Sequence, residues 1–192
     1  MLALPPEVRW FPDWMDAREA AALFDTLLAE TPWEDPVLVV FGRRIAMPRR
    51  VAFYGPHDYA YSGVLHEARS PPALLESVQR RIAEVAGQPF NTLLMNLYRD
   101  GADAVSWHSD DDYPHAGHPA VASLSLGATR RFRFAHRRDR ERRFGLDLTA
   151  GGLLLMEGRT QEEYRHALPR TAAQCGPRIN LTFRWMAASN RG

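Results

Sequence analysis

Residues 178–185 read RINLTFRW, and polar and hydrophobic residues alternate at every position. Successive side chains of a β-strand point to opposite faces, so this stretch predicts a strand with one hydrophobic and one polar face. The hydrophobic face carries Ile179, Leu181, Phe183 and Trp185, and the polar face carries Arg178, Asn180, Thr182 and Arg184. The polar face either lies in water or binds an anion such as a dicarboxylate, because a guanidinium matches the geometry of a carboxylate.

Several other segments after residue 90 are expected to be short strands. Alternating or short apolar runs occur at 92–98, 121–126, 131–134 and 152–156. Turn residues such as Asp100-Gly101 and Gly151-Gly152 separate them. Within 92–98, one face carries Leu93, Met95 and Leu97, and the other carries Leu94, Asn96 and Tyr98.

Two helices are expected before these strands. Asp16 followed by Glu19 is typical of a helix N-terminus, and the apolar stripe after it consists of Leu23, Phe24, Leu27 and Leu28. A second helix begins after Ser70-Pro71-Pro72 and ends at Gly87. Its expected buried side consists of Leu74, Leu75, Val78, Ile82 and Val85. Helices followed by many short strands predict an α+β domain built on an antiparallel sandwich or jelly roll.

The composition excludes several classes of protein. A chain of 192 residues with 45% hydrophobic and 24% charged residues is typical of one globular domain and not of a disordered chain. The single cysteine, Cys175, excludes an internal disulfide and a multi-cysteine metal site. No apolar run approaches the roughly 20 residues of a membrane helix, and the first residues lack the pattern of a secretory signal. We therefore expect a cytoplasmic protein without a membrane partner.

The charge is distributed unevenly along the chain. The net charge is only +1, and all 24 basic residues are arginine. Residues 130–143, RRFRFAHRRDRERR, contain eight arginines against Asp139 and Glu141. Such an excess is the electrostatic footprint of a nucleic-acid-binding protein, although a solvated basic loop has the same composition.

Residues 107–112 read WHSDDD and contain a candidate metal site. On an extended strand, His108 and Asp110 share a face, which is the spacing that two metal ligands need. Two histidines with one carboxylate suit a first-row divalent metal and are typical of non-haem Fe(II) sites. The candidates for the second histidine are His115, His118, His136 and His166. His166 is best placed, because it lies between the strands expected at 152–156 and 178–185.

The order of these motifs resembles that of the AlkB family of Fe(II)/2-oxoglutarate-dependent dioxygenases. The matching elements are NLYRDG at 96–101, HSD at 108–110, SLSLG at 123–127, His166 and RINLTFR at 178–184. The resemblance extends from about Val37 to Trp185 and is greatest to the subgroup that repairs alkylated bases in double-stranded DNA. It implies a single domain over 1–192. Flanking helices and a nucleotide-recognition lid would occupy 1–90, and a double-stranded β-helix, or jelly roll, would form the catalytic core at 91–186.

The resemblance also implies a set of ligands and a reaction. The catalytic residues that hold Fe(II) would be His108, Asp110 and His166. The residues that hold 2-oxoglutarate would be Asn96, Tyr98, Arg178, Thr182 and Arg184, with Asn180 as a supporting neighbour and Arg178 at the distal carboxylate. With O₂, members of this family oxidise N-alkyl groups on bases of the 1-methyladenine and 3-methylcytosine type, and the restored base is released together with formaldehyde.

Further residues resemble the subgroup's substrate contacts. A damaged base must leave the duplex to reach iron, and Val40, Phe41, Gly42 and Arg43 resemble a finger hairpin that fills the resulting gap. The alternative is that Val40 and Phe41 are ordinary core residues. The lid is matched by Tyr59, Tyr61 and Ser62, with Tyr61 stacking the flipped base against His108. Asp111 and Asp112 would complement a cationic base, although the subgroup commonly has glutamate at the position of Asp112.

The expected partner is therefore alkylated DNA, double- or single-stranded, bound by a monomer. Two alternatives stay open: the same chemistry on RNA or tRNA, and a non-catalytic nucleic-acid-binding jelly roll. The complete set of metal and arginine motifs argues against the second alternative.

Overall fold

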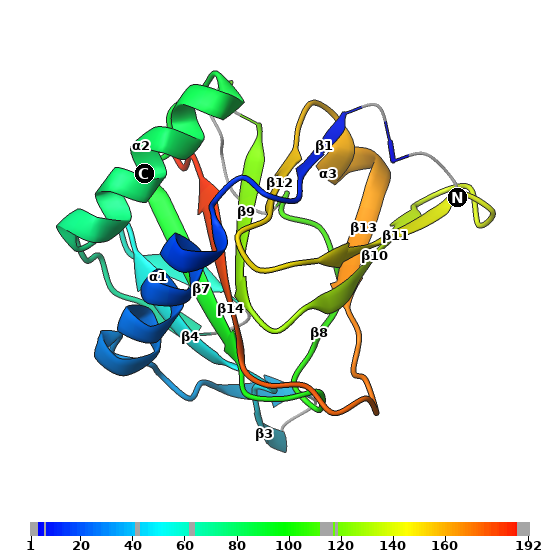
Figure 1. Cartoon of the computed structure of the whole chain (residues 1–192). Coiled ribbons are helices and arrows are strands. Elements are labelled where there is room, and N and C mark those ends of the chain that lie inside the picture. Colours follow the sequence, from blue (N-terminus) through cyan, green and yellow to red (C-terminus); the bar gives the residue numbers. More distant parts are fainter. Residues whose placement is uncertain are drawn as a thin grey trace, which may run out of the picture.

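The structure is a computed structural model that describes residues 4–5, 7–40, 43–61, 64–111, 117 and 119–187, with the backbone alone at 39, 40, 59–61 and 64. Two antiparallel sheets pack against each other, and two helices cover the outer face of the larger sheet (Figure 1). This α+β jelly roll is the fold that the sequence predicts.

The larger sheet has six strands in the order β1-β12-β9-β14-β7-β4. Its strands are β1 (Val8–Phe11), β12 (Leu153–Met156), β9 (Val121–Gly127), β14 (Arg178–Arg184), β7 (Thr92–Tyr98) and β4 (Arg50–Tyr54). Every neighbouring pair is antiparallel. Because β14 pairs with both β9 and β7, its polar face lies at the centre of the sheet.

The smaller sheet has four strands in the order β11-β10-β13-β8, so β8 is an edge strand. Its strands are β11 (Arg143–Leu148), β10 (Arg130–His136), β13 (Tyr164–Leu168) and β8 (Val105–His108). Two separate hairpins pair β2 (Val37–Val40) with β3 (Arg43–Ala46), and β5 (Tyr59–Tyr61) with β6 (Val64–His66). A short helix, α3 (Thr160–Glu163), precedes β13.

Helix α1 begins, and helix α2 begins and ends, where the sequence predicts. Helix α1 (Ala17–Glu30) is capped by the Asp16 side chain, which accepts hydrogen bonds from the backbone N–H groups of Arg18 and Glu19. Helix α2 (Ala73–Ala86) ends at Gly87, whose φ of 67° is a left-handed conformation that favours glycine. No helix in the described part of the chain is long and apolar enough to cross a membrane.

The alternation in β7 and β14 separates two hydrophobic cores. The odd-numbered residues of both strands pack under the helices, and this outer core includes Leu23, Leu27, Leu75, Val78, Ile82, Leu93, Met95, Ile179, Leu181 and Phe183. The even-numbered residues face the space between the sheets, where a second core includes Tyr98, Phe132, Phe134, Leu148, Leu154 and Leu168. The helices thus occupy the hydrophobic face, and the polar face remains inside the jelly roll.

The structure differs from the sequence-based expectations in three respects. Strands β1 and β4 belong to the larger sheet, so residue 90 does not divide helices and lid from the jelly roll. Leu28 and Leu74 are exposed and do not belong to the buried stripes of their helices. Trp185 lies beyond the last residue of β14. For β4 the cause is simple. Four of its five residues are buried, so its sequence lacks the alternation of polar and apolar residues that would predict a strand.

Candidate active site

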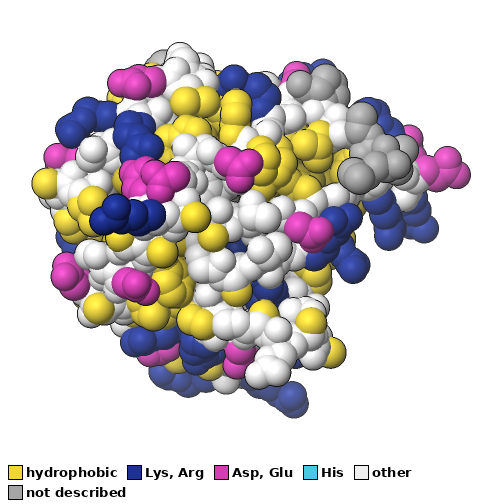
Figure 2. Space-filling view, in the orientation of Figure 1, with side chains coloured by type: hydrophobic (Ala, Val, Ile, Leu, Met, Phe, Trp, Pro, Cys, Tyr) yellow, Lys and Arg dark blue, Asp and Glu magenta, His cyan; other side chains and the backbone are white. Residues whose placement is uncertain are grey.

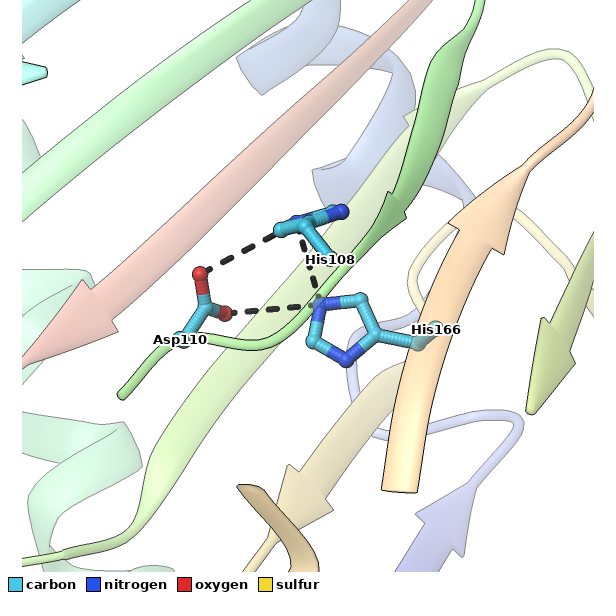
Figure 3. Close-up of side chains that lie close together, drawn as sticks. All are labelled: His108, Asp110 and His166. Carbon is cyan, nitrogen blue, oxygen red and sulfur yellow. Dashed lines mark hydrogen bonds and ion pairs between the residues drawn. The ribbon is translucent and has the colours of Figure 1, made fainter. Parts of the chain in front are cut away.

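Three candidate metal ligands converge between the two sheets (Figure 3). His108 ends β8, and it lies directly opposite His166 of β13 in the strand register. The Nε2 atoms of the two histidines are 3.1 Å apart. The Asp110 carboxylate oxygens lie 3.6 Å from the Nε2 of His166 and 3.9 Å from the Nε2 of His108. The sequence prediction that selects His166 as the distant histidine agrees with this geometry.

Asp110 reaches this position through a bend and not along a strand. Strand β8 ends at His108, so the expectation that His108 and Asp110 share a strand face is wrong. The Asp110 N–H donates to Oε1 of Gln161 at 2.9 Å, and the Ser109 hydroxyl donates to the Tyr164 carbonyl at 3.2 Å. These two hydrogen bonds take the place of backbone pairing after β8 and hold the chain in this bend.

The protonation states of the three residues suit a divalent cation. Burial lowers the pKa of His166 to about 3, an effect that Asp110 partly offsets, so the imidazole is neutral. The His108 Nδ1 donates to the Ser106 carbonyl at 2.8 Å, which leaves its Nε2 lone pair facing the site. Burial would raise the pKa of Asp110, but Arg184 and the two histidines more than offset it, so the carboxylate is charged. Two imidazoles and one carboxylate are a donor set that fits Fe(II).

All residues expected to bind 2-oxoglutarate line the same cavity as the metal ligands. Strand β7 contributes Leu94, Asn96 and Tyr98, and strand β14 contributes Arg178, Asn180, Thr182 and Arg184. The two strands are adjacent, and Asn96 is the register partner of Asn180. The polar face of β14 therefore lines an internal cavity and does not lie in water.

Arg178 is a buried cation that lacks an anion in the described chain. Its side chain is 1% exposed, and Nη2 donates to the Ser125 hydroxyl at 2.9 Å. The Nε and Nη1 atoms are buried without an acceptor among the described residues, and the guanidinium carbon lies 5.3 Å from the Tyr98 ring centroid. Burial lowers the pKa of Arg178 to about 10, with Tyr98 partly offsetting the effect. A buried guanidinium in this state fits a carboxylate ligand.

Other residues of the cavity already have partners within the protein. The Arg184 Nη2 donates to the Asp110 carboxylate at 2.5 Å, so Arg184 contacts a metal ligand. The Asn180 amide donates to the Ser123 hydroxyl at 3.0 Å and to the Leu124 carbonyl at 3.3 Å. Asn180 therefore links β14 to β9, which agrees with a supporting place beside the ligand.

Arg49 is a further member of the cavity. It is buried, lines the cavity, and donates from Nε to the Asn96 carbonyl oxygen at 2.7 Å. This contact orients the Asn96 amide, because it engages the side-chain oxygen. The contact follows from the pairing of β4 with β7. Local alternation does not reveal this pairing, so the sequence pattern does not predict the contact.

The expected substrate contacts are described only in part. Phe41, Gly42, Ser62 and Asp112 lie outside the described residues, as do the alternative ligands His115 and His118. The backbone of Val40 pairs with exposed Arg43, and Tyr59 and Tyr61 lie in a hairpin strand. Asp111 pairs with Arg137, which also donates to the Ser109 hydroxyl at 2.6 Å. His136 accepts hydrogen bonds from the backbone of Arg138 and Asp139 and does not line the cavity.

The basic run lies on the hairpin of β10 and β11. Figure 2 shows arginine side chains gathered at the right of the view, where Figure 1 places this hairpin. Arg130 is an exception, because it is buried and donates to the carbonyls of Asp100, Asp103 and Pro169. The other seven arginines of the run are exposed and form a basic surface.

Comparisons with known proteins assign the family. A family model for the 2OG-Fe(II) oxygenase superfamily matches residues 7–184. "Alpha-ketoglutarate-dependent dioxygenase alkB homolog 3" of Homo sapiens is 36% identical over 191 residues, which cover 95% of this chain and 67% of that protein. "DNA oxidative demethylase ALKBH2" of Homo sapiens is 35% identical over 178 residues, covering 86% and 68%.

The chain spans about two thirds of the length of these relatives. Among solved structures, OsALKBH1 has a similar fold, with a TM-score of 0.70 at 15% identity over 95% of this chain and 100% of that chain. The chain therefore belongs to the 2OG-Fe(II) oxygenase superfamily and, within it, to the AlkB family.

Proposed function

We propose that the protein is an Fe(II)/2-oxoglutarate-dependent dioxygenase that removes alkyl groups from nitrogen atoms of DNA bases. The observation that carries this proposal is the cavity in which the metal ligands lie together with the guanidinium of Arg178, which has no carboxylate partner among the described residues. The names of the relatives, a dioxygenase and a DNA oxidative demethylase, support DNA as the substrate.

The residues of the cavity have different roles in the proposed reaction. His108, Asp110 and His166 hold Fe(II), and Arg178 binds the distal carboxylate of 2-oxoglutarate. Bound iron, 2-oxoglutarate and O₂ supply the oxidation that converts an N-methyl group to N-hydroxymethyl, which leaves as formaldehyde while 2-oxoglutarate becomes succinate and CO₂. Arg184 orients the Asp110 carboxylate, and apolar walls that include Leu94, Phe132, Met156 and Leu168 exclude water.

The surface of the protein supports nucleic acid as the substrate. The exposed arginines of β10–β11 bind phosphates, whose neutralisation supplies much of the affinity for DNA. The tip between β2 and β3 fills the gap left by the flipped base, and the hairpin of β5 and β6 closes over that base. Bases of the 1-methyladenine and 3-methylcytosine type, in double- or single-stranded DNA, are the proposed lesions.

The test is formaldehyde release from matched single- and double-stranded oligonucleotides that carry one methylated base, with Fe(II) and 2-oxoglutarate present. We expect formaldehyde and succinate in equal amounts and only with iron present. Turnover of methylated RNA in place of DNA would change the substrate class. No formaldehyde from any methylated nucleic acid, although the protein binds iron and 2-oxoglutarate, would overturn the proposal.

A further inference from the structure

The metal ligand Asp110 lies on a bend, residues 109–111, that follows the last residue of β8 (Figure 3). This bend belongs to neither sheet, so contacts from other elements have to hold it against the site. The Asp110 N–H donates to the Gln161 side chain, and the Ser109 hydroxyl donates to the Tyr164 carbonyl. The position of the Asp110 carboxylate therefore depends on groups that are not themselves metal ligands.

Arg137 contacts the residues on both sides of Asp110 with one guanidinium. It directly follows the last residue of β10. Its Nη2 donates to the Ser109 hydroxyl at 2.6 Å and forms an ion pair with the Asp111 carboxylate. Since the same hydroxyl donates to the Tyr164 carbonyl, Ser109 connects Arg137 to the first residue of β13.

Arg137 is also fastened to α3. Its backbone N–H donates to the Glu163 carbonyl at 2.8 Å, and its Nη2 lies 3.2 Å from the Gln161 carbonyl oxygen. Helix α3 ends directly before β13, the strand that carries the ligand His166. The contacts of Arg137 therefore fix the bend that carries one metal ligand relative to the strand that carries another.

These contacts distinguish Arg137 from a residue that binds phosphate. It belongs to the basic run, whose exposed arginines suit the phosphates of DNA. An isolated exposed ion pair stabilises a protein little, but the side chain of Arg137 is 33% exposed and contacts Ser109 and Gln161 as well as Asp111. Moving its guanidinium to a phosphate would break the contacts that hold the bend.

We propose that Arg137 is a positioning residue of the metal centre, which holds residues 109–111 so that the Asp110 carboxylate faces His108 and His166. This inference rests on the metal site of the proposed function and not on its substrate. Removing a group that orients a metal ligand typically weakens metal binding by about 10–100-fold. Arg137 acts on the neighbours of Asp110 and not on its carboxylate, so an effect at the lower end of this range follows.

The experiment measures Ni(II) binding by calorimetry, without 2-oxoglutarate and DNA. Ni(II) binds such donors more tightly than Fe(II) does, so a weakened site stays measurable. Arg137→Gln should raise the Kd by about tenfold. Arg137→Lys keeps the charge and one donor group, so it should restore part of the affinity. Arg138→Gln, an exposed neighbour on the same loop, is the matched control and should bind Ni(II) like wild type.

A double variant tests whether Arg137 acts through Asp110. The Asp110→Ala protein keeps the two histidines and should bind Ni(II) more weakly. Adding Arg137→Gln to it should cause no further loss, because the ligand that Arg137 positions is gone. A residue that only stabilises the fold would lower the affinity by the same factor in both backgrounds. Equal affinities of wild type and Arg137→Gln, or full additivity of the two losses, would overturn the inference.

DNA binding separates Arg137 from the phosphate-binding arginines. For the metal-free protein and a single-stranded oligonucleotide, Arg138→Gln should lower the slope of log K against log salt by about 0.7. Arg137→Gln should leave this slope unchanged, because its guanidinium is engaged within the protein. A lower slope in Arg137→Gln together with wild-type affinity for Ni(II) would assign Arg137 to a phosphate and contradict the positioning role.

Formaldehyde release distinguishes failure of this inference from failure of the proposed function. If wild type releases formaldehyde from methylated DNA but Arg137→Gln binds Ni(II) like wild type, the positioning role is wrong and the proposed function stands. If wild type releases none from any methylated nucleic acid, although its Ni(II) affinity depends on Arg137 through Asp110, the proposed function is wrong and the positioning role stands.

Discussion

At the scale of single residues, the site depends on a few buried charged side chains, which include Asp110, Arg178 and Arg184. Asp110 is bonded to Arg184, and both side chains are buried. Arg178 has no carboxylate partner among the described residues. Removing one charge of such a set leaves another uncompensated, which affects both ligand binding and stability.

Asp110→Ala should abolish turnover and destabilise the fold. The change removes a metal ligand and leaves Arg184 buried without its carboxylate, which should lower the free energy of unfolding by about 3 kcal/mol or more. Formaldehyde release and urea unfolding measure the two effects. Asp25→Ala, which removes an exposed carboxylate on α1, is the control and should change neither turnover nor metal binding. Retained turnover in Asp110→Ala would remove this residue from the metal site.

Arg178→Lys should weaken the binding of 2-oxoglutarate while keeping the positive charge. Lysine cannot offer two parallel N–H groups to one carboxylate, so we expect a loss of about 1–3 kcal/mol. Calorimetry with Mn(II) measures this binding. The exposed Arg165→Lys on β13 serves as the matched control. An unchanged affinity in Arg178→Lys would exclude this residue from the binding site.

At the scale of secondary-structure elements, two hairpins project from the jelly roll toward solvent. The β2–β3 hairpin has exposed apolar residues on its stem, Val37 and Ile45. The β10–β11 hairpin carries the exposed arginines. The two hairpins have different chemistry, so they should affect different steps of substrate binding.

Phe41→Ala should impair turnover of duplex substrates selectively. A residue that fills the stack is needed only where a base leaves a duplex, so we expect a loss of roughly tenfold on double strands and little on single strands. Rates of formaldehyde release on matched oligonucleotides measure this ratio. Ile45→Ala, on the stem of the same hairpin, is the control. Equal losses on both substrates would contradict the role of Phe41 in filling the stack and would favour the alternative that it is a core residue.

Exchanging the exposed arginines Arg138 and Arg140 for glutamine should reduce the salt dependence of DNA binding. Each lost phosphate contact should lower the slope of log K against log salt by about 0.7–0.9. Binding titrations at several salt concentrations measure the slope. Arg80→Gln on α2 should leave it unchanged, because that residue lies on the helical side. An unchanged slope after the exchange of Arg138 and Arg140 would show that other residues contact the phosphates.

At the scale of the whole molecule, stability should decline in two steps as the pH falls. Burial lowers the pKa of His66, an effect partly offset by Glu34 3.8 Å away, so the unfolded chain takes up a proton first as the pH falls below about 6.5. Burial would raise the pKa of Asp103, but hydrogen bonds from Arg99 more than offset it, so its pKa lies below 3.8. Its contribution is present at neutral pH and is lost below about pH 4.

Urea unfolding across the pH range measures both steps. Asp103→Asn should lower the free energy of unfolding by about 1–3 kcal/mol at neutral pH and flatten the step below pH 4. The exposed Asp147→Asn should change neither. A stability curve of Asp103→Asn that parallels wild type below pH 4 would show that Asp103 is not the group responsible.

The sequence by itself determined the chemistry of the site and most of the elements. Alternation along 92–98 and 178–184 assigned every residue of these two strands to the correct face, since side-chain direction in a strand depends only on local period. The caps at Asp16 and Gly87 bounded the helices for the same local reason. Two histidines and one carboxylate indicated a metal, whereas the arginines of 178–184 were assigned to an anion only through the family resemblance.

Only the tertiary structure decided which distant segments meet. The membership of β1 and β4 in the larger sheet, the bond from Arg49 to Asn96 and the bond from Arg184 to Asp110 join residues between 39 and 148 positions apart. No local period encodes such pairing, because it follows from how the sheets and cores pack together. The same packing brings Arg137 to Ser109 and Asp111, which lie on either side of the metal ligand Asp110. Local pattern thus specifies the direction of side chains, and long-range packing specifies their neighbours.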